Sequence, residues 1–537
     1  MPALAELTDV VELCRHQAEC FPDRRSHVFL DHTGNESAAL TFGELDLRAR
    51  AIAARLRDLV GPGACAVLSH ARGVDFVPAF LGCLYAGVVA VPAPATRRTH
   101  GDPRFERLAD IVADARPDLL LCGSDRLAGR GLVDRALPTD LVDPAHAERF
   151  QPVPVGPDAI SHVQYTSGAT GKPKGVVITH GNVLANVRLI AGSAPDTPDR
   201  PPTVTWLPLF HDMGLVGGVL HPLYAGRTSV VMAPQDFARS PVTWLAALDR
   251  YRAEFAAAPA LGYDRCARQV TDEQRDALDL SRLRVAVISD EPLRAETVDA
   301  FAARFARSGF RREAFFPGYG LAESTVLVSG GPRAGGPVIT AFDPEELAAG
   351  RVRPSPHGRR LVASGVPDPA CTVVITDPDT GEPLPPDRVG EIRVAGPSVG
   401  AGYWRRPDDP AFGTTVPGHG GGFLRTGNLG FRHDGLLHVR CRLADAITVD
   451  GRVLMPYDLE DAVVASHPAI RAACAFTDPA GRVVVLAETR EPVAVEVPDV
   501  DLVVPVRPGT LRYTTSGKLR RADTRAAWLS GRDGRTR

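Results

Sequence analysis

Lysine is rare in this chain, and the few lysines occupy positions suited to phosphate chemistry. The 537 residues include 61 basic side chains, yet lysine occurs only at Lys172, Lys174 and Lys518. These residues lie in two loops rich in Gly, Ser and Thr, "TSGATGKPKG" (166–175) and "RYTTSGKLRR" (512–521). An ammonium is a compact, rotatable point charge and a guanidinium is a planar fork, so the two are not interchangeable beside a reacting phosphate or carboxylate. We therefore predict that the three lysines serve chemistry.

The stretch "VQYTSGATGKPKGVVITHGNV" (163–183) predicts an anion-binding loop between a strand and a helix. Its hydroxyls and closely approaching backbone N–H groups together form a nest for an anion. It is not a Walker A loop, because only two residues separate Gly168 from Gly171 and Pro173 follows Lys172. An ordinary flexible connection is the alternative, which the concentration of lysine here disfavours.

Length and composition describe a chain of more than one domain. At 537 residues it exceeds what a single hydrophobic core supports. The net charge of −3, without a long basic run, argues against nucleic acid as the main partner. The nine cysteines form no CxxC pair, which favours reduced thiols and a cytoplasmic location over a disulfide framework or a zinc site.

No targeting segment and no membrane span are expected. The N-terminus lacks a basic region followed by an apolar core. The longest uncharged stretch (77–95) is interrupted by Pro78, Gly82, Gly87 and Pro92, whereas a bilayer span needs about 20 predominantly apolar residues. We predict a buried helix, a turn and a short buried strand there.

The elements that must position the lysine loops alternate between helical and strand-like patterns. Apolar residues repeat on one face of 42–59, which predicts a helix. The runs "ACAVLSH", "PDLLLCGSD" and "TSVVMAP" are short and apolar, which is typical of strands buried on both faces. This alternation favours an α/β fold with largely parallel sheets.

The pattern changes twice toward the C-terminus. From about residue 364, β runs around turns rich in Pro, Gly and Asp predict a β-rich subdomain. After about residue 441, a strand, a helix opened near Pro456 and two further strands predict a small α+β unit. We place the boundary near 441–445, which gives a large N-terminal domain (1–440) and a small C-terminal domain (441–537).

The lysine-rich loop and several later motifs resemble one family, the adenylate-forming superfamily of acyl- and aryl-CoA ligases, luciferases and adenylation domains. The segment "TWLPLFHDMGLVGGVLHPLYAG" (205–226) is similar to the fatty acyl-AMP ligase branch in particular. Further motifs follow in the family's order over essentially the whole chain: "GYGLAESTVLVSGG" (318–331), "GEIRVAGPSVGAGYW" (390–404), "LRTGNLGFRHDGLLHVRCRLAD" (424–445) and "RPGTLRYTTSGKLRR" (507–521).

The resemblance implies a two-step enzyme that uses ATP and Mg²⁺. A small-molecule carboxylic acid, in this branch a fatty acid, attacks the α-phosphate of ATP and gives an acyl-adenylate and pyrophosphate. The phosphopantetheine thiol of an acyl carrier protein then takes the acyl group. The first step brings two anions together, so positive charge and positioning must do most of the catalysis.

The resemblance also implies roles for individual residues, with the C-terminal domain as a mobile lid. Lys518 matches the lid lysine that bridges the carboxylate and the α-phosphate, and His211 matches a position near the acyl carboxylate and the γ-phosphate. Glu323 matches the position that helps to hold magnesium. The remaining implied contacts are Thr166, Ser167, Gly168, Thr170, Gly171 and Lys174 with the phosphates, Ser289, Asp290, Glu291, Tyr319 and Gly320 beside adenine, and Asn428 and Arg442 at the ribose.

Two departures from the family pattern lie next to the expected nucleotide. Residues 288–292 read Ile-Ser-Asp-Glu-Pro where the family usually has Asn-Gly-Ala-Glu-Pro, so Ser289 and Asp290 replace small residues. Asn428 stands where an Asp normally accepts hydrogen bonds from both ribose hydroxyls. Its neutral amide forgoes a charge-assisted bond, which is roughly twice as strong. Weaker ATP binding is therefore expected.

Two further departures concern the lid. Ala444 occupies the hinge position usually held by Lys or Asp. Between Arg490 and Arg507 the chain lacks the amphipathic helix of about 10–15 residues that the family places there. We expect an abbreviated C-terminal domain, in which adenylate formation is better supported than domain rotation and thiol delivery.

Alternatives remain for the acceptor, the acid and the class of protein. The segment 330–365 resembles the one that disfavours free coenzyme A in fatty acyl-AMP ligases, and the acid itself could be short, aromatic, amino-bearing or a non-carboxylic oxyacid such as nitrite. "GPSVG" (396–400) matches the G-x-S-x-G elbow of hydrolases, but the residues after Ser398 do not predict a helix. A degenerate, non-catalytic homologue is the remaining hypothesis.

Overall fold

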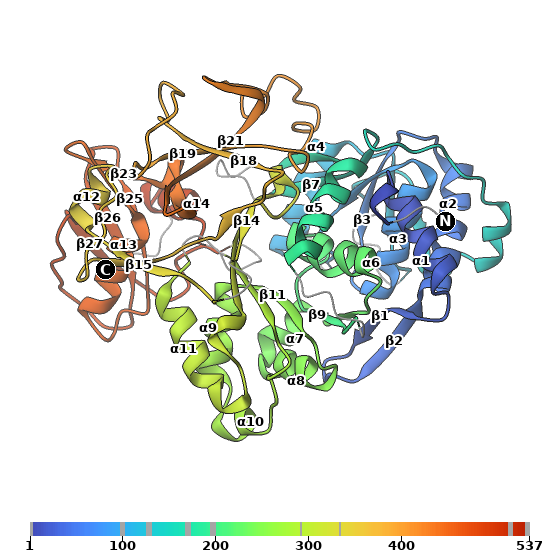
Figure 1. Ribbon diagram of the computed structural model, residues 1–537, viewed down its shortest axis with the longest axis horizontal. Coiled ribbons are helices and arrows are strands. Elements are labelled where there is room, and N and C mark those ends of the chain that lie inside the picture. The colour runs from blue at the N-terminus through green and yellow to red at the C-terminus, as the bar shows by residue number, and fades with distance from the viewer. Residues whose placement is uncertain are drawn as a thin grey trace.

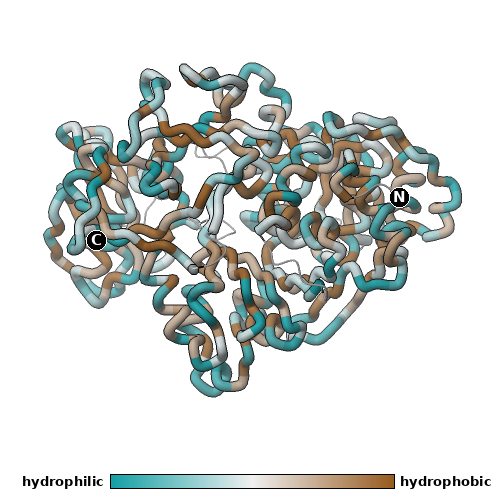
Figure 2. Tube along the Cα trace, in the orientation of Figure 1, coloured by the Kyte–Doolittle hydropathy of each residue, from teal (hydrophilic) through white to brown (hydrophobic). Residues whose placement is uncertain are grey.

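The computed structural model alternates helices and strands as the sequence predicts, and the α/β prediction is confirmed (Figure 1). Apolar segments follow the strands and the helices packed on them, and polar segments follow the peripheral connections (Figure 2). The described residues are 4–96, 102–124, 131–166, 173–193, 200–289, 293–331, 335–513 and 519–531.

A six-stranded sheet carries the two strands that flank the lysine-rich loop. It is parallel except for its last strand, and its side chains alternate between two buried layers. Leu68 faces the cluster formed with α2 (Phe42–Leu59) and α3 (Gly73–Ala86), and Val67 faces the cluster formed with α4 (Pro103–Ala115). The order is β6 (Ala136–Pro138), β5 (Leu119–Cys122), β3 (Cys65–Ser69), β4 (Val89–Pro92), β7 (Ile160–Thr166) and β8 (Lys174–Thr179).

The helices predicted around this sheet are confirmed. Helix α2 begins with a capping box, in which Thr41 and Glu44 satisfy each other's backbone N–H groups. The stretch 77–95 contains the end of α3, a turn at Gly87 with φ of 67°, and β4. Among the described residues, no helix combines the length and apolar character needed to cross a membrane.

A nine-stranded sheet forms the second large layer. Its strands from β13 to β1 are parallel, so the carboxyl ends of β12 and β13 lie side by side and place Ser289 next to the segment that begins at Tyr319. The order is β17 (Val366–Pro367), β14 (Ser329–Gly330), β13 (Phe315–Tyr319), β12 (Val285–Ser289), β11 (Phe255–Pro259), β9 (Thr203–Thr205), β10 (Ser229–Val231), β1 (Arg25–Leu30) and β2 (Glu36–Thr41).

Helices connect and cover the parallel strands of this second sheet. The π-helical η4 (Met213–Leu220) is the next element after β9 and contributes to the main apolar cluster. The α-helices of this region are α5 (His180–Ser193), α6 (His221–Ala225), α7 (Pro234–Arg239), α8 (Val242–Arg250), α9 (Ala260–Gln269), α10 (Asp272–Asp276) and α11 (Ala295–Phe305), and α1 (Val10–Cys20) packs at the N-terminus.

The β-rich subdomain predicted from residue 364 is confirmed as an antiparallel sheet. Its strands are β18 (Thr372–Thr376), β19 (Gly390–Ala395), β20 (Thr414–Val416), β21 (His419–His433) and β22 (Leu436–Arg442). A separate hairpin, β15 (Ile339–Phe342) and β16 (Arg359–Val362), with α12 (Pro344–Ala348) between its strands, forms the segment that resembles the ligase insertion.

The C-terminal part is the α+β unit that the sequence predicts (orange to red in Figure 1). Strands β26 and β27 are parallel, a pairing that usually requires a helical crossover. Residues 489–501 contain no helix; Val493, Val495 and Val497 pack against the apolar cluster instead. The unit contains β23 (Ile447–Val449), β24 (Arg452–Leu454), α13 (Pro456–Ser466), β25 (Ala472–Thr477), β26 (Val483–Glu488), β27 (Leu502–Val506) and α14 (Arg521–Leu529).

Candidate active site

The ends of the lysine-rich loop are fixed by the β7–β8 pair. Thr166 and Lys174 face each other in the antiparallel register, and the Thr166 hydroxyl donates to the Lys174 carbonyl at 3.5 Å. Arg107 of α4 donates to the Thr166 carbonyl. The predicted phosphate contacts Ser167, Gly168, Thr170 and Gly171 lie outside the described residues, as does Lys172.

Lys174 is held between an aromatic ring and a carboxylate. Its ammonium lies 4.6 Å from the centroid of the Tyr403 ring and donates to Asp409 Oδ2 at 3.1 Å. Phe412 packs edge-on against the same ring at 5.1 Å. These contacts restrict a flexible four-carbon side chain while leaving 31% of it exposed, so the ammonium is both oriented and accessible.

Tyr403 joins Lys174 to Glu323, the residue predicted to hold magnesium. The Tyr403 hydroxyl donates to Glu323 Oε1 at 2.7 Å, and the N–H of Gly400 donates to the Glu323 carbonyl at 2.9 Å. Burial raises the pKa of the Glu323 carboxyl, as does the Asp212 carboxylate, while the Tyr403 hydrogen bond and Arg442 act in the opposite direction. Glu323 is therefore a desolvated carboxylate, a kind of group that binds a cation strongly when one is supplied.

His211 and Asp212 lie at the start of η4. His211 Nδ1 lies 2.6 Å from Asp212 Oδ1, and the same oxygen accepts the Met213 N–H at 2.6 Å. The Asp212 carboxylate also contributes to the raised pKa of Glu323. The sequence analysis singled out His211 and missed Asp212, although the two are adjacent in one motif.

The predicted nucleotide residues meet where β13 ends and β21 pairs with β22. Asn428 Nδ2 donates to the Tyr319 hydroxyl at 2.8 Å, and both side chains are buried. Asn428 and Arg442 face each other in the register, and Arg442 leads into the 3₁₀ turn Leu443–Asp445. A Cβ on Gly320 would lie 1.5 Å from the Val326 carbonyl oxygen, so the backbone requires glycine there.

Ser289 is the last residue of β12 and is half-buried, while Asp290 and Glu291 lie outside the described residues. It lies beside the end of β13, and its contact with the adenine stays a prediction.

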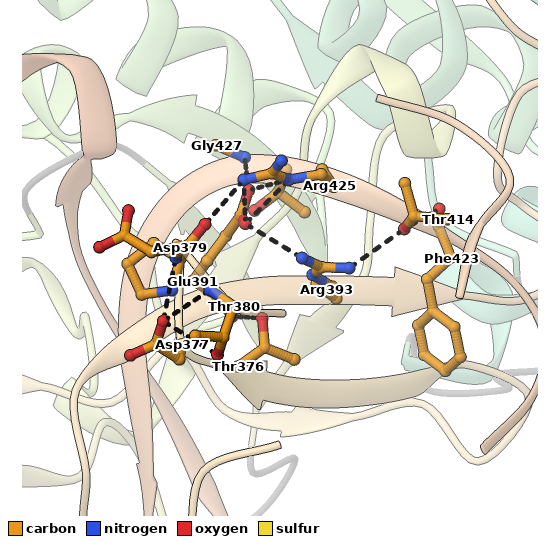
Figure 3. A network of polar contacts seen from close by, with 12 residues as sticks. Thr376, Asp377, Asp379, Thr380, Glu391, Arg393, Thr414, Phe423, Arg425 and Gly427 are labelled. Carbon is orange, nitrogen blue, oxygen red and sulfur yellow. Dashed lines mark hydrogen bonds and ion pairs between the residues drawn. The ribbon is translucent and has the colours of Figure 1, made fainter. Parts of the chain in front are cut away.

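A buried ionic network anchors the strand that carries Asn428 (Figure 3). The Glu391 carboxylate is 1% exposed; Arg425 pairs with it at 2.9 Å, and the Gly427 N–H donates to it at 3.3 Å. Arg393 lies 3.8 Å from the same carboxylate and donates to Thr414. Because a buried carboxylate requires such compensation, this network fixes residues 425–427, immediately before Asn428.

Lys518 lies outside the described residues, but the two ends of its loop are brought together. Tyr513 and Leu519 form an antiparallel bridge, and the Arg520 N–H donates to the Arg512 carbonyl at 2.8 Å. Arg521 pairs with Glu460 of α13 at 2.8 Å, which ties the chain after the loop to the α+β unit.

Ser398 does not have the geometry of a hydrolase nucleophile. It is 1% exposed, and the residues that follow it, 399–442, form turns and strands rather than a helix. The Ser398 carbonyl accepts the Thr325 hydroxyl at 2.7 Å, so the "GPSVG" turn packs against the segment that carries Glu323. Its role is structural.

Tyr403 and Asp409 are functional candidates that the sequence analysis did not name. Tyr403 lies in the quoted "GAGYW" motif, so a signal for it existed. No local sequence signal indicated Asp409, in "RPDDP", because its contact with Lys174 spans 235 positions.

Comparison with known proteins identifies relatives of this chain. A model of the AMP-binding enzyme family matches residues 14–404. The medium-chain-fatty-acid–[acyl-carrier-protein] ligase JamA of Moorena producens (strain JHB) is 35% identical over 568 residues, which cover 98% of this chain and 96% of JamA. The long-chain-fatty-acid–AMP ligase FadD23 of Mycobacterium tuberculosis (strain CDC 1551 / Oshkosh) is 32% identical, with 96% and 95% covered.

Solved structures of ligases also match the fold of this chain. The crystal structure of fatty acid AMP ligase from Legionella pneumophila superimposes with a TM-score of 0.79 at 32% identity, covering 98% of this chain and 97% of that chain. A fatty acyl-adenylate ligase from L. pneumophila, in complex with acyl adenylate and pyrophosphate, matches with the same TM-score of 0.79 at 31% identity and 98% coverage of this chain. The chain therefore belongs to the AMP-binding enzyme family, and the adenylate-forming superfamily that its motifs resemble is confirmed.

Proposed function

We propose that this protein is a fatty acyl-AMP ligase that activates a fatty acid with ATP to acyl-AMP and pyrophosphate, and then transfers the acyl group to the phosphopantetheine thiol of an acyl carrier protein. The observation that carries the proposal is the continuous contact from Lys174 through Tyr403 to Glu323. It connects the strand after the lysine-rich loop to a desolvated carboxylate, next to the Tyr319–Asn428 pair. The relatives named for fatty acids match nearly the whole chain.

The residues of this site fit Mg²⁺. The Glu323 and Asp212 carboxylates are hard oxygen donors, and Mg²⁺ is usually bound by one or two carboxylates together with substrate phosphates. When bound, Mg²⁺ would neutralise negative charge on the ATP phosphates.

The chain's own residues supply the other contacts with the substrates. We propose that Lys174, oriented by Tyr403 and Asp409, binds phosphate oxygens, and that Tyr319 forms a flat apolar wall for the adenine. His211 is proposed as a hydrogen-bonding side chain for the carboxylate or the γ-phosphate. Lys518 then supplies the charge that lets two anions approach each other.

We propose that the protein works in the cytoplasm. We also propose that residues 441–537 act as a lid that brings Lys518 into the active site. The support is that the α+β unit has apolar clusters of its own, one around Val463 and Val485 and one around Leu486 and Trp528.

The proposal of a carrier protein rather than coenzyme A as acceptor rests on the insertion-like segment. Arg359 of β16 pairs with Asp458 at 2.9 Å and with Asp461 at 2.7 Å, both on α13. Arg294 also pairs with Asp461 at 2.8 Å. These ion pairs stabilise the observed orientation of the α+β unit, and we propose that this disfavours the rearrangement needed to accept free coenzyme A. JamA, the relative at 35% identity, is named as a carrier-protein ligase.

Replacing Arg359 by alanine is expected to increase acyl-CoA formation about fivefold, with little change in adenylate formation. Removing two partly exposed ion pairs destabilises this orientation of the α+β unit by about 1 kcal/mol, which corresponds to roughly a fivefold change in an equilibrium. Arg360→Ala is the matched control, because its neighbouring guanidinium pairs with Asp299 of α11 instead. The measurement is thioester yield with coenzyme A and with carrier protein; an equal response of both variants would refute the role of Arg359.

Asn428→Asp is expected to lower the KM for ATP about fivefold. A carboxylate accepts ribose hydroxyls through charge-assisted bonds, and the gain over a neutral amide is about 1 kcal/mol. Tyr319 can then donate its hydroxyl to the new carboxylate, so the buried pair stays satisfied. The measurement is the ATP dependence of pyrophosphate exchange at saturating acid. An unchanged or higher KM would mean that Asn428 does not face the ribose.

ATP–pyrophosphate exchange over a panel of acids tests the proposed function directly. Exchange with medium- and long-chain fatty acids supports it. Exchange only with short, aromatic or amino-bearing acids, or with nitrite, changes the substrate while keeping adenylation. The absence of exchange with every acid, from a folded protein, favours the degenerate homologue.

A further inference from the structure

A pocket of about 380 Å³ lies on the other side of the segment that carries Tyr403. Its walls are the C-terminal end of α4 and the residues after Gly402: Ala113, Asp114, Arg116, Trp404, Arg405 and Arg406. Tyr403 contacts Glu323, while the next residue, Trp404, donates its indole N–H to the Ala115 carbonyl of α4 at 3.3 Å. The residues that line this pocket include none of Lys174, Tyr403 and Glu323, so the pocket is separate from the candidate active site.

The pocket carries an excess of positive charge. Within the part of the chain that the structure describes, the guanidinium groups of Arg116 and Arg405 have no hydrogen-bond or ion-pair partner, and both residues are exposed. The one carboxylate of the wall cannot neutralise them. Both carboxylate oxygens of Asp114 already accept hydrogen bonds, one from Arg406 at 2.6 Å and one from the Tyr165 hydroxyl at 2.7 Å.

The backbone gives a second, independent observation. Arg116 has φ of 48° and Arg405 has φ of 58°, so both lie in the left-handed region that glycine occupies at no steric cost. Many glycines of this chain occupy such positions, yet arginine stands at these two. Non-glycine residues in strained conformations gather at functional sites. Nine non-glycine residues of the described chain have a positive φ, four of them arginines, and two of these four line this one pocket.

The indole provides an apolar wall beside the two free guanidinium groups. Trp404 is half-buried and packs against the cluster that contains Val67 and Tyr165, so its ring is held in place. Guanidinium groups recognise phosphate oxygens through paired hydrogen bonds, and an indole face accepts a planar or aliphatic group. We propose that this pocket binds a phosphate-bearing small molecule, with Arg116 and Arg405 on the phosphate and Trp404 against the rest of it.

Tryptophan fluorescence with 4-nitrophenyl phosphate as the probe tests the site. Trp206, Trp244 and Trp528 are all buried, so quenching by the nitrophenyl group reports mainly on Trp404. We expect saturable quenching that is lost in Trp404→Phe and is competed by inorganic phosphate. In Arg116→Gly/Arg405→Gly the apparent Kd should rise roughly tenfold or more, since two charge-assisted contacts are removed.

Glycine is the informative substitution, because it accepts the left-handed backbone without strain. The double variant should therefore keep or raise its Tm while losing the probe, a combination that a purely structural role of the arginines does not produce. Arg48→Ala, an exposed arginine on α2 without a partner among the described residues, is the control for loss of charge and should bind normally.

Three results would show that this pocket is not a phosphate site. Equal quenching in the double variant, persistence of the signal in Trp404→Phe, or no competition by inorganic phosphate would each refute it. Competition arms with AMP and with phosphopantetheine distinguish a nucleotide from a pantetheine source, and displacement by either supports the site. Quenching by the probe does not depend on adenylation. Failure of the probe to bind would therefore refute this site without refuting the proposed function.

Discussion

Lys518→Ala is expected to lower the rate of acyl-adenylate formation about 100- to 1000-fold while leaving ATP binding largely intact. The loss is that of one preorganised charge aimed at a developing anionic transition state, for which factors of this size are typical. The residue contacts the reacting groups only when carboxylate and α-phosphate approach each other, so the effect falls on kcat rather than on the affinity for ATP. The measurements are ATP–pyrophosphate exchange and equilibrium ATP binding.

Two further variants make this experiment specific. Arg520→Ala removes a nearby cation that is already paired with Asp523 at 2.5 Å, and it should retain nearly full activity. Lys518→Arg keeps the charge but replaces a rotatable ammonium by a planar fork, and it should remain strongly impaired. Full activity of Lys518→Ala would remove this lysine from the mechanism. Full activity of Lys518→Arg would show that charge alone is required.

Glu323→Gln is expected to lower activity about 100-fold at a fixed, limiting Mg²⁺ concentration. An amide keeps the shape and still accepts the Tyr403 hydroxyl, but it removes the negative charge on which a hard divalent cation depends. Added Mg²⁺ should recover part of the activity. The measurement is the Mg²⁺ dependence of exchange; a wild-type dependence would exclude Glu323 as a ligand.

The raised pKa of Glu323 sets the direction of its pH dependence. Burial favours the protonated carboxyl, so protons compete with Mg²⁺ at a higher pH than they would at an ordinary glutamate of pKa 4.5. Apparent Mg²⁺ affinity of the wild type should therefore weaken as the pH falls toward this raised pKa.

The same shift gives a test of stability. The folded state binds this proton more tightly than the unfolded state, so the ionised carboxylate costs stability at neutral pH, and that cost disappears as the pH falls through the folded pKa. Glu323→Gln removes the ionisable group. It should unfold at or above the wild-type Tm at neutral pH even though activity is lost, which separates a ligand role from misfolding.

Tyr403→Phe is the matched control for this pair. It removes the hydrogen bond that lowers the pKa of Glu323, so the loss of Mg²⁺ affinity should begin at a still higher pH. The phenyl ring retains a face for Lys174. An unchanged profile in Tyr403→Phe would mean that the hydroxyl does not tune the carboxylate.

The elements that position the site could be predicted from the sequence, because their signals are local. The helix 42–59 has apolar residues at helical spacing and its own capping box, so α2 has the predicted bounds. Short apolar runs closed by turn formers became β3, β5 and β10. The lysine-rich loop followed from composition and spacing, and the ordered motifs identified the family. Each of these signals lies within one stretch of the chain.

What only the tertiary structure decided is which side chains meet. Tyr403 reaches Glu323 across 80 positions, and Lys174 reaches Asp409 across 235, through pairings of sheets and loops that no local period encodes. Arg116 and Arg405, both in left-handed conformations, came to line one pocket only when α4 packed against the segment after Gly402. The sequence determined the residues and elements available for phosphate chemistry, and long-range packing determined their electrostatic environment.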